Sequence, residues 1–411
     1  MNYLIVGNGP AALSAAETLR QQDGRSQIRL LSREQESCYS PCPLAEYVEG
    51  HLTRAQLFLR DANFYTRLGL DFRPGQPVTR IDPVQHQVQT LAGNRFDYDR
   101  LLLAHGARAV VPPIPGLAGT RGVFELKTLA DADAILARLP EARQAVVIGS
   151  GFIGLEAVQA LVRRGLEVSL LESRGHVLPA MLDEEMAGLV QQQLTRHGVQ
   201  LHLNSTACEV LADAQGVSAV RTARQTLPAR LVICAAGVRP DLSLLEGSGL
   251  ACQRGILVNE RMQTSDPDIF AAGDVIELQD ATGAGQVVPI WPNAVSTGRV
   301  AAWNMLGQPR CHPGLEAVNV VRVLGLAVAS FGSRQGDHCV RWQDGRGAVR
   351  KIILQEGRIA GAQLVGEING TGVLHELMKK RVAVARFGEA LARPGFSYIH
   401  AMEPLRTVQW A

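Results

Sequence analysis

Two stretches of the chain repeat one order of apolar and polar positions. Each has a short apolar run, a glycine-rich turn and then an apolar segment long enough for a helix: residues 5–16 and residues 147–158. A second apolar run follows each of them, at residues 27–32 and 167–172. The pattern predicts a strand–turn–helix–strand unit that is made twice.

The glycine-rich turns have the spacing of a dinucleotide-binding turn. The first glycine makes the tight turn, the second lets the backbone approach a pyrophosphate, and the third position must be small so that helix packs on strand. These positions are Gly7, Gly9 and Ala12 in the first copy and Gly149, Gly151 and Gly154 in the second. One such turn also occurs without a ligand, but two in the same setting favour two dinucleotide sites.

An acidic residue about 20 positions downstream is expected to hold the ribose of each dinucleotide. The second copy supplies Glu172, whose carboxylate would accept ribose hydroxyls and repel a 2′-phosphate. We therefore favour NADH over NADPH, although Arg174 nearby could accept a 2′-phosphate. In the first copy Glu34 is the candidate, with Ser32 as the substitute.

The remaining pattern predicts further elements around these two units. From Ala317 onward it changes to strands followed by a helix, which suggests a separate C-terminal domain. The expected strands lie at residues 101–104, 231–235, 318–329, 339–342 and 349–354, and the expected helices at residues 182–197 and 372–380.

Composition narrows the class of protein. The 411 residues are 46% hydrophobic and 19% charged, as expected for a globular enzyme of two or three domains. The net charge of +2 gives no reason to expect nucleic acid or an anionic membrane as partner. No run of 18 apolar residues is present, and a strand from Tyr3 leaves no length for a signal peptide. The seven cysteines are scattered, which fits a reducing compartment, and we therefore expect the cytoplasm. They form no cluster with the spacing of metal ligands, so we expect no bound metal.

Five segments, in this order, resemble the FAD-dependent pyridine nucleotide–disulfide oxidoreductase superfamily over essentially the whole chain. They are Gly7-Asn-Gly-Pro-Ala-Ala12, Ala104-His-Gly-Ala107, Gly149-Ser-Gly-Phe-Ile-Gly-Leu-Glu156, Ala236-Gly-Val-Arg-Pro240 and Thr264-Ser-Asp-Pro-Asp-Ile-Phe-Ala-Ala-Gly-Asp274. The resemblance implies an α/β fold with two Rossmann-like dinucleotide-binding domains, for FAD and NAD, and a small α+β C-terminal domain. It implies an FAD domain at 1–112 and 243–315, an NAD(H) domain at 113–242 and an interface domain at 316–411.

The resemblance also assigns cofactor contacts. For FAD they are Gly7, Gly9, Pro10, Ala11, Ala12, Ser32, Arg33, Glu34, Ala104, His105, Gly106, Gly273, Asp274, Trp291, Pro292 and Asn293. For NAD(H) they are Gly149, Gly151, Phe152, Ile153, Gly154, Glu156, Glu172, Ala236 and Gly237.

Several of these residues carry particular expectations. Asp274 would bind the ribityl chain, and the helix from Trp291 would aim its positive end at the flavin ring. Phe152 and Glu156 would lie beside the nicotinamide. Ordinary core packing is the alternative for Trp291 and Phe152. His105 departs from the threonine usual in relatives.

The segment Ser37-Cys-Tyr-Ser-Pro-Cys-Pro-Leu-Ala-Glu-Tyr47 bears on the electron acceptor. It resembles both the single-cysteine run of coenzyme A-disulfide reductases and NADH oxidases and the thiol-free run of rubredoxin and ferredoxin reductases. The combined pattern resembles more closely the FAD subunits of anaerobic multi-subunit enzymes, such as phenylglyoxylate dehydrogenase and tungsten-containing aldehyde oxidoreductase. Cys42 is thus a packed side chain near the flavin, a redox thiol, or one half of a disulfide with Cys38.

The sequence therefore favours an NADH oxidoreductase subunit that passes electrons between NAD(H), FAD and an iron–sulfur partner in a hetero-oligomer. The alternative is a free-standing homodimeric reductase of coenzyme A disulfide, peroxide or oxygen that uses Cys42 as its catalytic thiol. A flavin-binding protein without turnover is a third possibility, which Glu156 and Glu172 count against. Near the C-terminus, His400 and Glu403 fit a structural role better than an acid–base pair.

Overall fold

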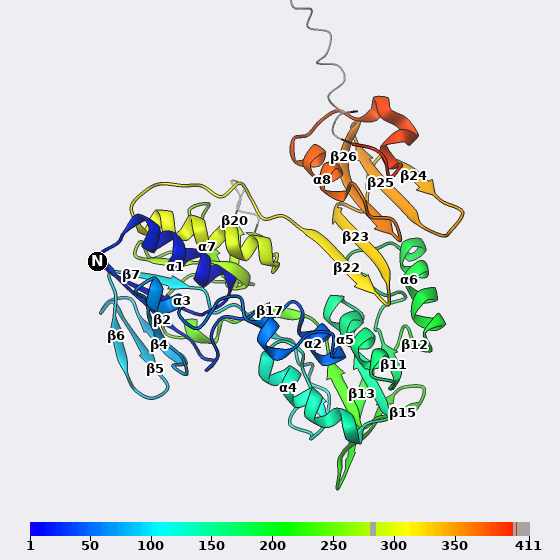
Figure 1. Ribbon diagram of the computed structural model, residues 1–411, viewed down its shortest axis with the longest axis horizontal. Coiled ribbons are helices and arrows are strands. Elements are labelled where there is room, and N and C mark those ends of the chain that lie inside the picture. Colours follow the sequence, from blue (N-terminus) through cyan, green and yellow to red (C-terminus); the bar gives the residue numbers. More distant parts are fainter. Residues whose placement is uncertain (280–284, 398–399, 401–411) are drawn as a thin grey trace, which may run out of the picture. The chain divides into compact units, whose positions relative to one another are not determined.

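The computed structural model describes residues 1–279, 285–397 and 400. The chain folds into two compact units (Figure 1). The first unit consists of Met1–Val110 and Val238–Glu316, and the second of Val111–Gly237 and Ala317–Ala411. Each unit contains one of the two predicted glycine-rich turns, so the repeated pattern in the sequence corresponds to two separate sheets.

The first unit is built on a parallel five-stranded sheet with β1 at its centre. The strand order is β19 (Ile269–Ala271), β7 (Arg100–Leu103), β1 (Asn2–Val6), β2 (Gln27–Leu31) and β3 (Asp71–Arg73). Side chains on both faces of β1 and β7 are buried, as is usual in a parallel sheet covered on both sides. All strands therefore end at one edge, where the first glycine-rich turn begins.

Two helices of this unit, α1 (Pro10–Gln22) and α7 (Trp291–Met305), pack closely against each other. A Cβ on Gly298 would lie 2.2 Å from the carbonyl oxygen of Ala11, so only glycine allows this backbone contact. Smaller antiparallel pairings complete the unit. They are β4 (Val78–Asp82) with β5 (Gln87–Thr90) and β6 (Arg95–Asp97), β8 (Ala107–Ala109) with β17 (Val238–Pro240), and β20 (Ile276–Gln279) with β21 (Gly285–Gln286); β18 (Ile256–Val258) pairs parallel to β20.

The second unit repeats the parallel architecture. Its five strands follow the order β12 (Gln200–His202), β11 (Glu167–Leu171), β10 (Gln144–Ile148), β16 (Leu231–Cys234) and β9 (Val123–Phe124). The helices are α4 (Leu129–Arg138), α5 (Phe152–Arg163) and α6 (Glu184–Arg196), and β13 (Ala207–Asp213), β14 (Gly216–Thr222) and β15 (Thr226–Pro228) form an antiparallel sheet. Helix α6 begins two residues later than predicted because the Asp183 carboxylate caps it by accepting from the Met186 N–H at 2.9 Å.

The C-terminal part of the second unit is an antiparallel five-stranded sheet with α8 (Thr371–Lys379) beside it. The order is β22 (Val318–Val323), β23 (Leu326–Gly332), β26 (Arg358–Val365), β25 (Val349–Gln355) and β24 (His338–Gln343). The range 318–329, predicted as strand, is a hairpin whose turn at Leu324 and Gly325 has positive φ at both residues. Strand β26 was not predicted at all.

This C-terminal sheet is tied to the rest of the second unit by polar contacts. Gln159 of α5 accepts a hydrogen bond from the Leu324 N–H at 2.7 Å, and Gln193 of α6 donates to the Leu324 oxygen at 2.7 Å. The Lys351 ammonium donates to Asp183 at 2.7 Å. These contacts join the central and C-terminal segments into one compact body, and the predicted boundary at residue 316 between separate domains stays a prediction.

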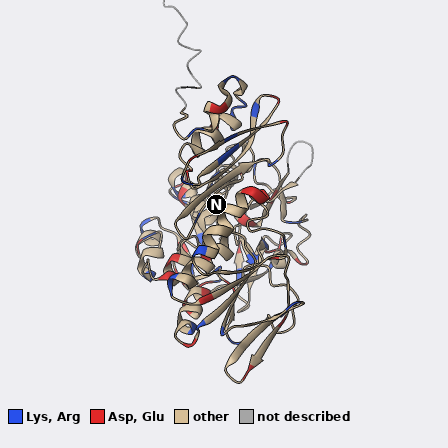
Figure 2. Cartoon of the chain, turned by 90° about the vertical axis from the view of Figure 1, so that its right-hand side faces the viewer, with Lys and Arg blue, Asp and Glu red and all other residues tan. Residues whose placement is uncertain are grey.

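Basic and acidic residues are interspersed along the described elements (Figure 2), in keeping with the small net charge. Among the described residues no helix is both long and apolar enough to cross a bilayer. Short helical segments complete the chain: α2 (Leu44–Glu49), α3 (Phe64–Arg67) and the 3₁₀ turns at Arg54–Leu57, Leu139–Glu141, Ser243–Leu245, Gly273–Val275 and Ala385–Ala392.

One buried charge stands out in the C-terminal sheet. Arg350 on β25 is 1% exposed, and its Nε and Nη1 atoms have no hydrogen-bond partner among the described residues. Burial lowers the pKa of the Arg350 guanidinium. The negative charge of Glu367 acts in the opposite direction and raises this pKa. We expect Arg350→Met to raise the free energy of unfolding by about 1–3 kcal/mol, because it removes a buried charge that is incompletely hydrogen-bonded within the described residues and keeps the volume. Denaturant unfolding would measure this, with the exposed Arg346→Met as control. A less stable Arg350→Met protein would contradict it.

Candidate functional site

The first glycine-rich turn has the geometry of a phosphate cradle. Gly7 has φ +123°, and a Cβ there would lie 2.2 Å from the Ala104 oxygen, so no other residue fits. Gly9 is the N-cap of α1, and no side chain caps the helix. A Cβ on Gly9 would have no atom within 4 Å, and the first turn holds no acidic residue. The open space and the N–H groups at this helix start suit a pyrophosphate.

The second turn repeats this geometry in the second unit. Gly149 has φ +102°, and a Cβ there would lie 2.4 Å from the Ala235 oxygen. Gly151 is the N-cap of α5 with no side-chain cap and with open space beside it. A Cβ on Gly154 would lie 2.0 Å from the Gly149 oxygen, so this glycine allows α5 to pack on its strand. The residues of both turns therefore fit the phosphates of a dinucleotide.

Glu172 lies directly after β11 and is held firmly beside the second turn. It is 6% exposed. One carboxylate oxygen accepts from the Ser150 N–H at 3.1 Å and the Ser150 hydroxyl at 2.5 Å, and the other from the Ser173 hydroxyl at 3.1 Å and the Arg174 N–H at 2.7 Å. The two serine hydroxyls can rotate, so the carboxylate can exchange them for ribose hydroxyls without moving.

Ser150, between the two glycines, was not predicted as a site residue. Its counterpart in the first copy, Asn8, accepts a hydrogen bond from the Tyr65 hydroxyl at 2.8 Å. In both copies this polar residue ties the glycine-rich turn to neighbouring chain. The polar residue inside each Gly-x-Gly sequence was the available signal.

The first copy places its candidate ribose contacts after β2. Ser32 is buried and Glu34 is half-buried. The Tyr39 hydroxyl donates to the Glu34 carboxylate at 2.6 Å. The largely exposed Arg33 guanidinium lies 3.4 Å from the Asp241 carboxylate. The Glu34 carboxylate thus accepts a hydrogen bond from Tyr39. The Arg33 guanidinium forms an ion pair with Asp241.

His105 is held in one tautomer. Its Nε2 lies 2.8 Å from the Asp241 carbonyl oxygen, which can only accept, so Nε2 carries the hydrogen and Nδ1 a lone pair. Nδ1 is buried and has no partner among the described residues. Burial lowers the pKa of His105 despite the nearby Asp241. The Nδ1 atom, next to Gly106, can therefore accept a hydrogen bond from a donor group of a bound cofactor.

The segment around Asp274 is anchored to α1 and α7. The Gly273 N–H donates to the Thr297 hydroxyl at 3.0 Å, and a Cβ on Gly273 would lie 3.0 Å from the Ala11 side chain. This contact brings Asp274 close to the start of α1. Three of the segments predicted to bind FAD, the start of α1, the segment around Asp274 and α7, therefore meet within the first unit.

The start of α7 agrees with the predicted helix from Trp291. Trp291 is half-buried, Pro292 is exposed and Asn293 is buried. The Asn293 amide donates to the oxygens of Val288 and Glu316, each at 3.0 Å, and its oxygen accepts from the Glu316 N–H at 3.1 Å. All its amide groups are thus used to hold chain segments, and a direct FAD contact through this side chain stays a prediction.

Phe152 and Glu156 lie one turn apart on α5 and therefore share a face. Both are half-buried, as is Ile153, whereas the core of the helix is made by Gly154, Leu155 and Val158. Phe152 is thus only partly buried, and its place beside the nicotinamide stays a prediction. At the end of β16, Ala236 and Gly237 are exposed, and Gly237 has φ +105° with open space beside it.

The two cysteines near residue 40 differ in their surroundings, and neither forms a disulfide. Cys38 is 2% exposed, and burial raises the pKa of its thiol to about 12. Cys42 is exposed in the turn before α2. A buried thiol with so high a pKa is a poor nucleophile, so Cys38 contributes to packing and only Cys42 is accessible.

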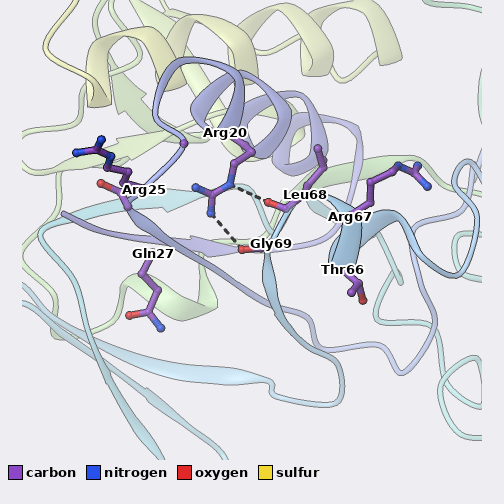
Figure 3. A pocket seen from close by; sticks show the side chains of 9 residues that line it. Arg20, Arg25, Gln27, Thr66, Arg67, Leu68 and Gly69 are labelled. Carbon is purple, nitrogen blue, oxygen red and sulfur yellow. Dashed lines mark hydrogen bonds between the residues drawn. The ribbon is translucent and has the colours of Figure 1, made fainter.

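Three further features lie outside these turns. An open pocket lined by Arg20, Gly24–Gln27 and Thr66–Gly69 is found at the amino end of β2, the edge opposite to the glycine-rich turn (Figure 3). Arg20 donates there to the Leu68 and Gly69 oxygens at 2.7 and 3.1 Å.

His400 accepts from the Ser397 N–H at 3.1 Å, and Glu403 lies outside the described residues. The described residues contain no group of three or more His, Cys, Asp or Glu arranged for a metal.

The chain belongs to the pyridine nucleotide-disulphide oxidoreductase family, whose model matches residues 1–298. It is 31% identical over 386 residues to the epsilon subunit of NADH-dependent phenylglyoxylate dehydrogenase of Aromatoleum evansii, covering 92% of this chain and 91% of that one. It is 31% identical over 430 residues to an NADH oxidase of Methanocaldococcus jannaschii, covering 97% and 94%. The crystal structure of a covalent putidaredoxin reductase–putidaredoxin complex matches with TM-score 0.88 and 26% identity, over 99% of each chain.

These findings confirm the predicted class. The chain is an FAD-dependent NAD(P)H oxidoreductase that binds FAD and NAD(H), with the Rossmann-like fold expected from its glycine-rich turns. It is similar over nearly its full length to a subunit of an NADH-dependent dehydrogenase and to an NADH oxidase.

The first turn allows a direct test of cofactor binding. We expect Gly7→Ala to lose most of its bound flavin and at least about 2 kcal/mol of stability, because the new Cβ clashes with the Ala104 oxygen at a strained φ. Flavin absorbance of the purified protein and thermal unfolding measure both effects. The matched control is Gly93→Ala, at φ +84° with open space, which should cost about 1 kcal/mol and keep the flavin. Full flavin content in Gly7→Ala would refute the assignment of this turn.

Proposed function

We propose that this protein is the flavin subunit of an electron-transfer complex, which passes electrons between NAD(H) and an iron–sulfur protein. The supporting observation is the near full-length similarity to the epsilon subunit of phenylglyoxylate dehydrogenase, combined with two separate phosphate cradles in one chain. The similar putidaredoxin reductase was crystallised joined to putidaredoxin. The scattered thiols further support a reducing compartment, the cytoplasm.

The residues of the second unit bind and orient the nicotinamide nucleotide. The N–H groups at the start of α5 hold its pyrophosphate, and Glu172 accepts its ribose hydroxyls. Phe152 and Glu156 share a face of α5 that would receive the nicotinamide, and the open space at Gly237 would leave room for the ring. Hydride transfer then depends on this positioning, and no protein acid or base is required.

The residues of the first unit hold FAD. The start of α1 binds the pyrophosphate, Glu34 or Ser32 the adenosine ribose, and Asp274 the ribityl chain. The His105 Nδ1, which has no partner among the described residues, would accept a hydrogen bond from the cofactor. The amino end of α7, from Trp291, would face the flavin ring, where the positive end of the helix would stabilise negative charge. FAD supplies the chemistry, since it accepts a hydride and releases electrons singly.

A second candidate function rests on the exposure of Cys42. In this alternative the chain is a free-standing homodimeric reductase of coenzyme A disulfide, peroxide or oxygen, and the Cys42 thiolate is the redox group. The similarity to an NADH oxidase gives it some support. Because Cys38 is buried, a dithiol mechanism with Cys42 is disfavoured.

The nucleotide assignment predicts a change of cofactor preference. We expect Glu172→Ala to weaken NADH binding about tenfold or more and to reduce the preference for NADH over NADPH, since a charged ribose acceptor is lost. Steady-state KM values for both nucleotides measure this. Glu167→Ala, in the exposed first residue of the same strand, is the control and should behave as wild type. An unchanged NADH KM in Glu172→Ala would remove Glu172 from the site.

The two candidate functions differ in their need for Cys42. If the electron-transfer role holds, NADH bleaches the flavin of the isolated chain, a one-electron iron–sulfur acceptor is reduced, and Cys42→Ser keeps these rates within about twofold. Disulfides and peroxide should not be reduced. Stopped-flow absorbance and acceptor assays measure both, and Cys208→Ser, another exposed cysteine, is the control.

Either of two results would decide against the electron-transfer role. One is a large loss of disulfide or peroxide reduction in Cys42→Ser, which would establish the thiol reductase. The other is failure of NADH to bleach the flavin at any concentration. Co-purification from the native host with iron quantified would identify the partner directly.

A further inference from the structure

Glu125 stands at the edge of the second sheet where the strands end. The strands β11, β10, β16 and β9 are all parallel, so their carboxyl ends share one edge. The register pairs Val232 with Val123 and Ile233 with Phe124, and one step further along it Cys234 is level with Glu125. Cys234 in turn pairs with Ile148 on β10, and Ile148 is the residue before Gly149. Glu125 is therefore two strand spacings, about 10 Å, from the strand that carries the glycine-rich turn.

The strand order shows which half of the dinucleotide Glu125 would meet. From β10 the chain runs through α5 to β11 and through α6 to β12, all on one side, whereas β16 and β9 lie on the other side. A dinucleotide crosses such a switch point with its phosphates at the turn. Since Glu172 after β11 holds the adenosine ribose in the proposed function, the nicotinamide nucleotide extends over β16 and β9.

The surroundings of Glu125 leave its carboxylate available. It is partly exposed and makes no hydrogen bond or ion pair with the described residues. The nearby Asp131 carboxylate is occupied, because it accepts from the N–H groups of Lys127 and Thr128 at 3.0 and 2.8 Å in the cap of α4. The Cys234 thiol is buried, and burial raises its pKa, so it carries no charge at neutral pH. Burial, the Asp131 charge and the opposing Lys127 charge together leave the pKa of Glu125 raised.

We propose that Glu125 is a further positioning residue for the nicotinamide end of NAD(H), and that its charge favours the oxidised form. The nicotinamide ring of NAD⁺ is positively charged and that of NADH is neutral. A carboxylate beside it therefore stabilises bound NAD⁺ and leaves NADH almost unaffected. This inference rests on the proposed nucleotide role of the turn at Gly149 and extends it to the choice between substrate and product.

The test compares three ligands on the FAD-loaded full chain by titration calorimetry. NAD⁺ carries the ring charge, 1,4,5,6-tetrahydro-NAD has a neutral ring that donates no hydride, and ADP-ribose has no ring. In Glu125→Gln, which keeps the shape and loses the charge, NAD⁺ affinity should fall up to about fivefold, as for a half-exposed charge. Affinity for the other two ligands should not change. Glu184→Gln, in the exposed first turn of α6, is the control.

The results separate this inference from the proposed function. If Glu125→Gln binds NAD⁺ as wild type does, or loses affinity equally for all three ligands, Glu125 has no charge-dependent role at the nicotinamide and the inference is overturned. If wild-type protein fails to bind ADP-ribose at all, the nucleotide site itself is wrong, and both proposals fall. Loss confined to NAD⁺ supports the inference.

Discussion

Both nucleotide sites depend on a backbone contact that only glycine permits. At Gly7 and Gly149 the chain passes so close to the carbonyl of the neighbouring strand that a Cβ would lie within 2.2 and 2.4 Å of its oxygen. Because the turn is this tight, the next helix begins directly at the end of the strand, and its first N–H groups are left without backbone partners. A bound pyrophosphate satisfies them, so the fold creates an anion site as a consequence of its own geometry.

The local features of this arrangement could be predicted from the sequence, because they follow from nearby residues. The two glycine patterns, the apolar runs and the acid after the second strand identified the α/β class and placed Glu172 beside its turn. Pairings between distant segments could not be predicted in this way. Strand β9 has two residues and acquires its structure from its neighbour β16, and β26, Arg358–Val365, has no regular alternation of polar and apolar residues and is interrupted by Gly361. The role proposed for Glu125 could therefore not be predicted from the sequence.

Single side chains show the same limit. The resemblance identified Asn293 as a cofactor contact, and only the structure shows that its amide also holds Val288 and Glu316. His105 departs from the usual threonine, and only the contact with Asp241 defines its tautomer. Conversely, Ser150 and Tyr39, which orient the two candidate ribose carboxylates, escaped prediction, because a hydroxyl gains a role only from the partner that the fold provides.

The two copies differ in a way that fits the different ligands proposed for them. In the first unit α7 packs on α1 through Gly298, and Gly273 contacts Ala11, so further chain covers the helix start and Gly9 is half-buried. In the second unit, α5 contacts other chain through Gln159, which accepts a hydrogen bond from the Leu324 N–H. Gln159 lies about two turns along the helix from Gly151, which is exposed. A cradle with a second helix packed beside it suits a cofactor that stays bound, and a more exposed one suits a nucleotide that must leave after each hydride transfer. One duplicated unit can thus serve a resident flavin and an exchanging nicotinamide through the segments packed around it.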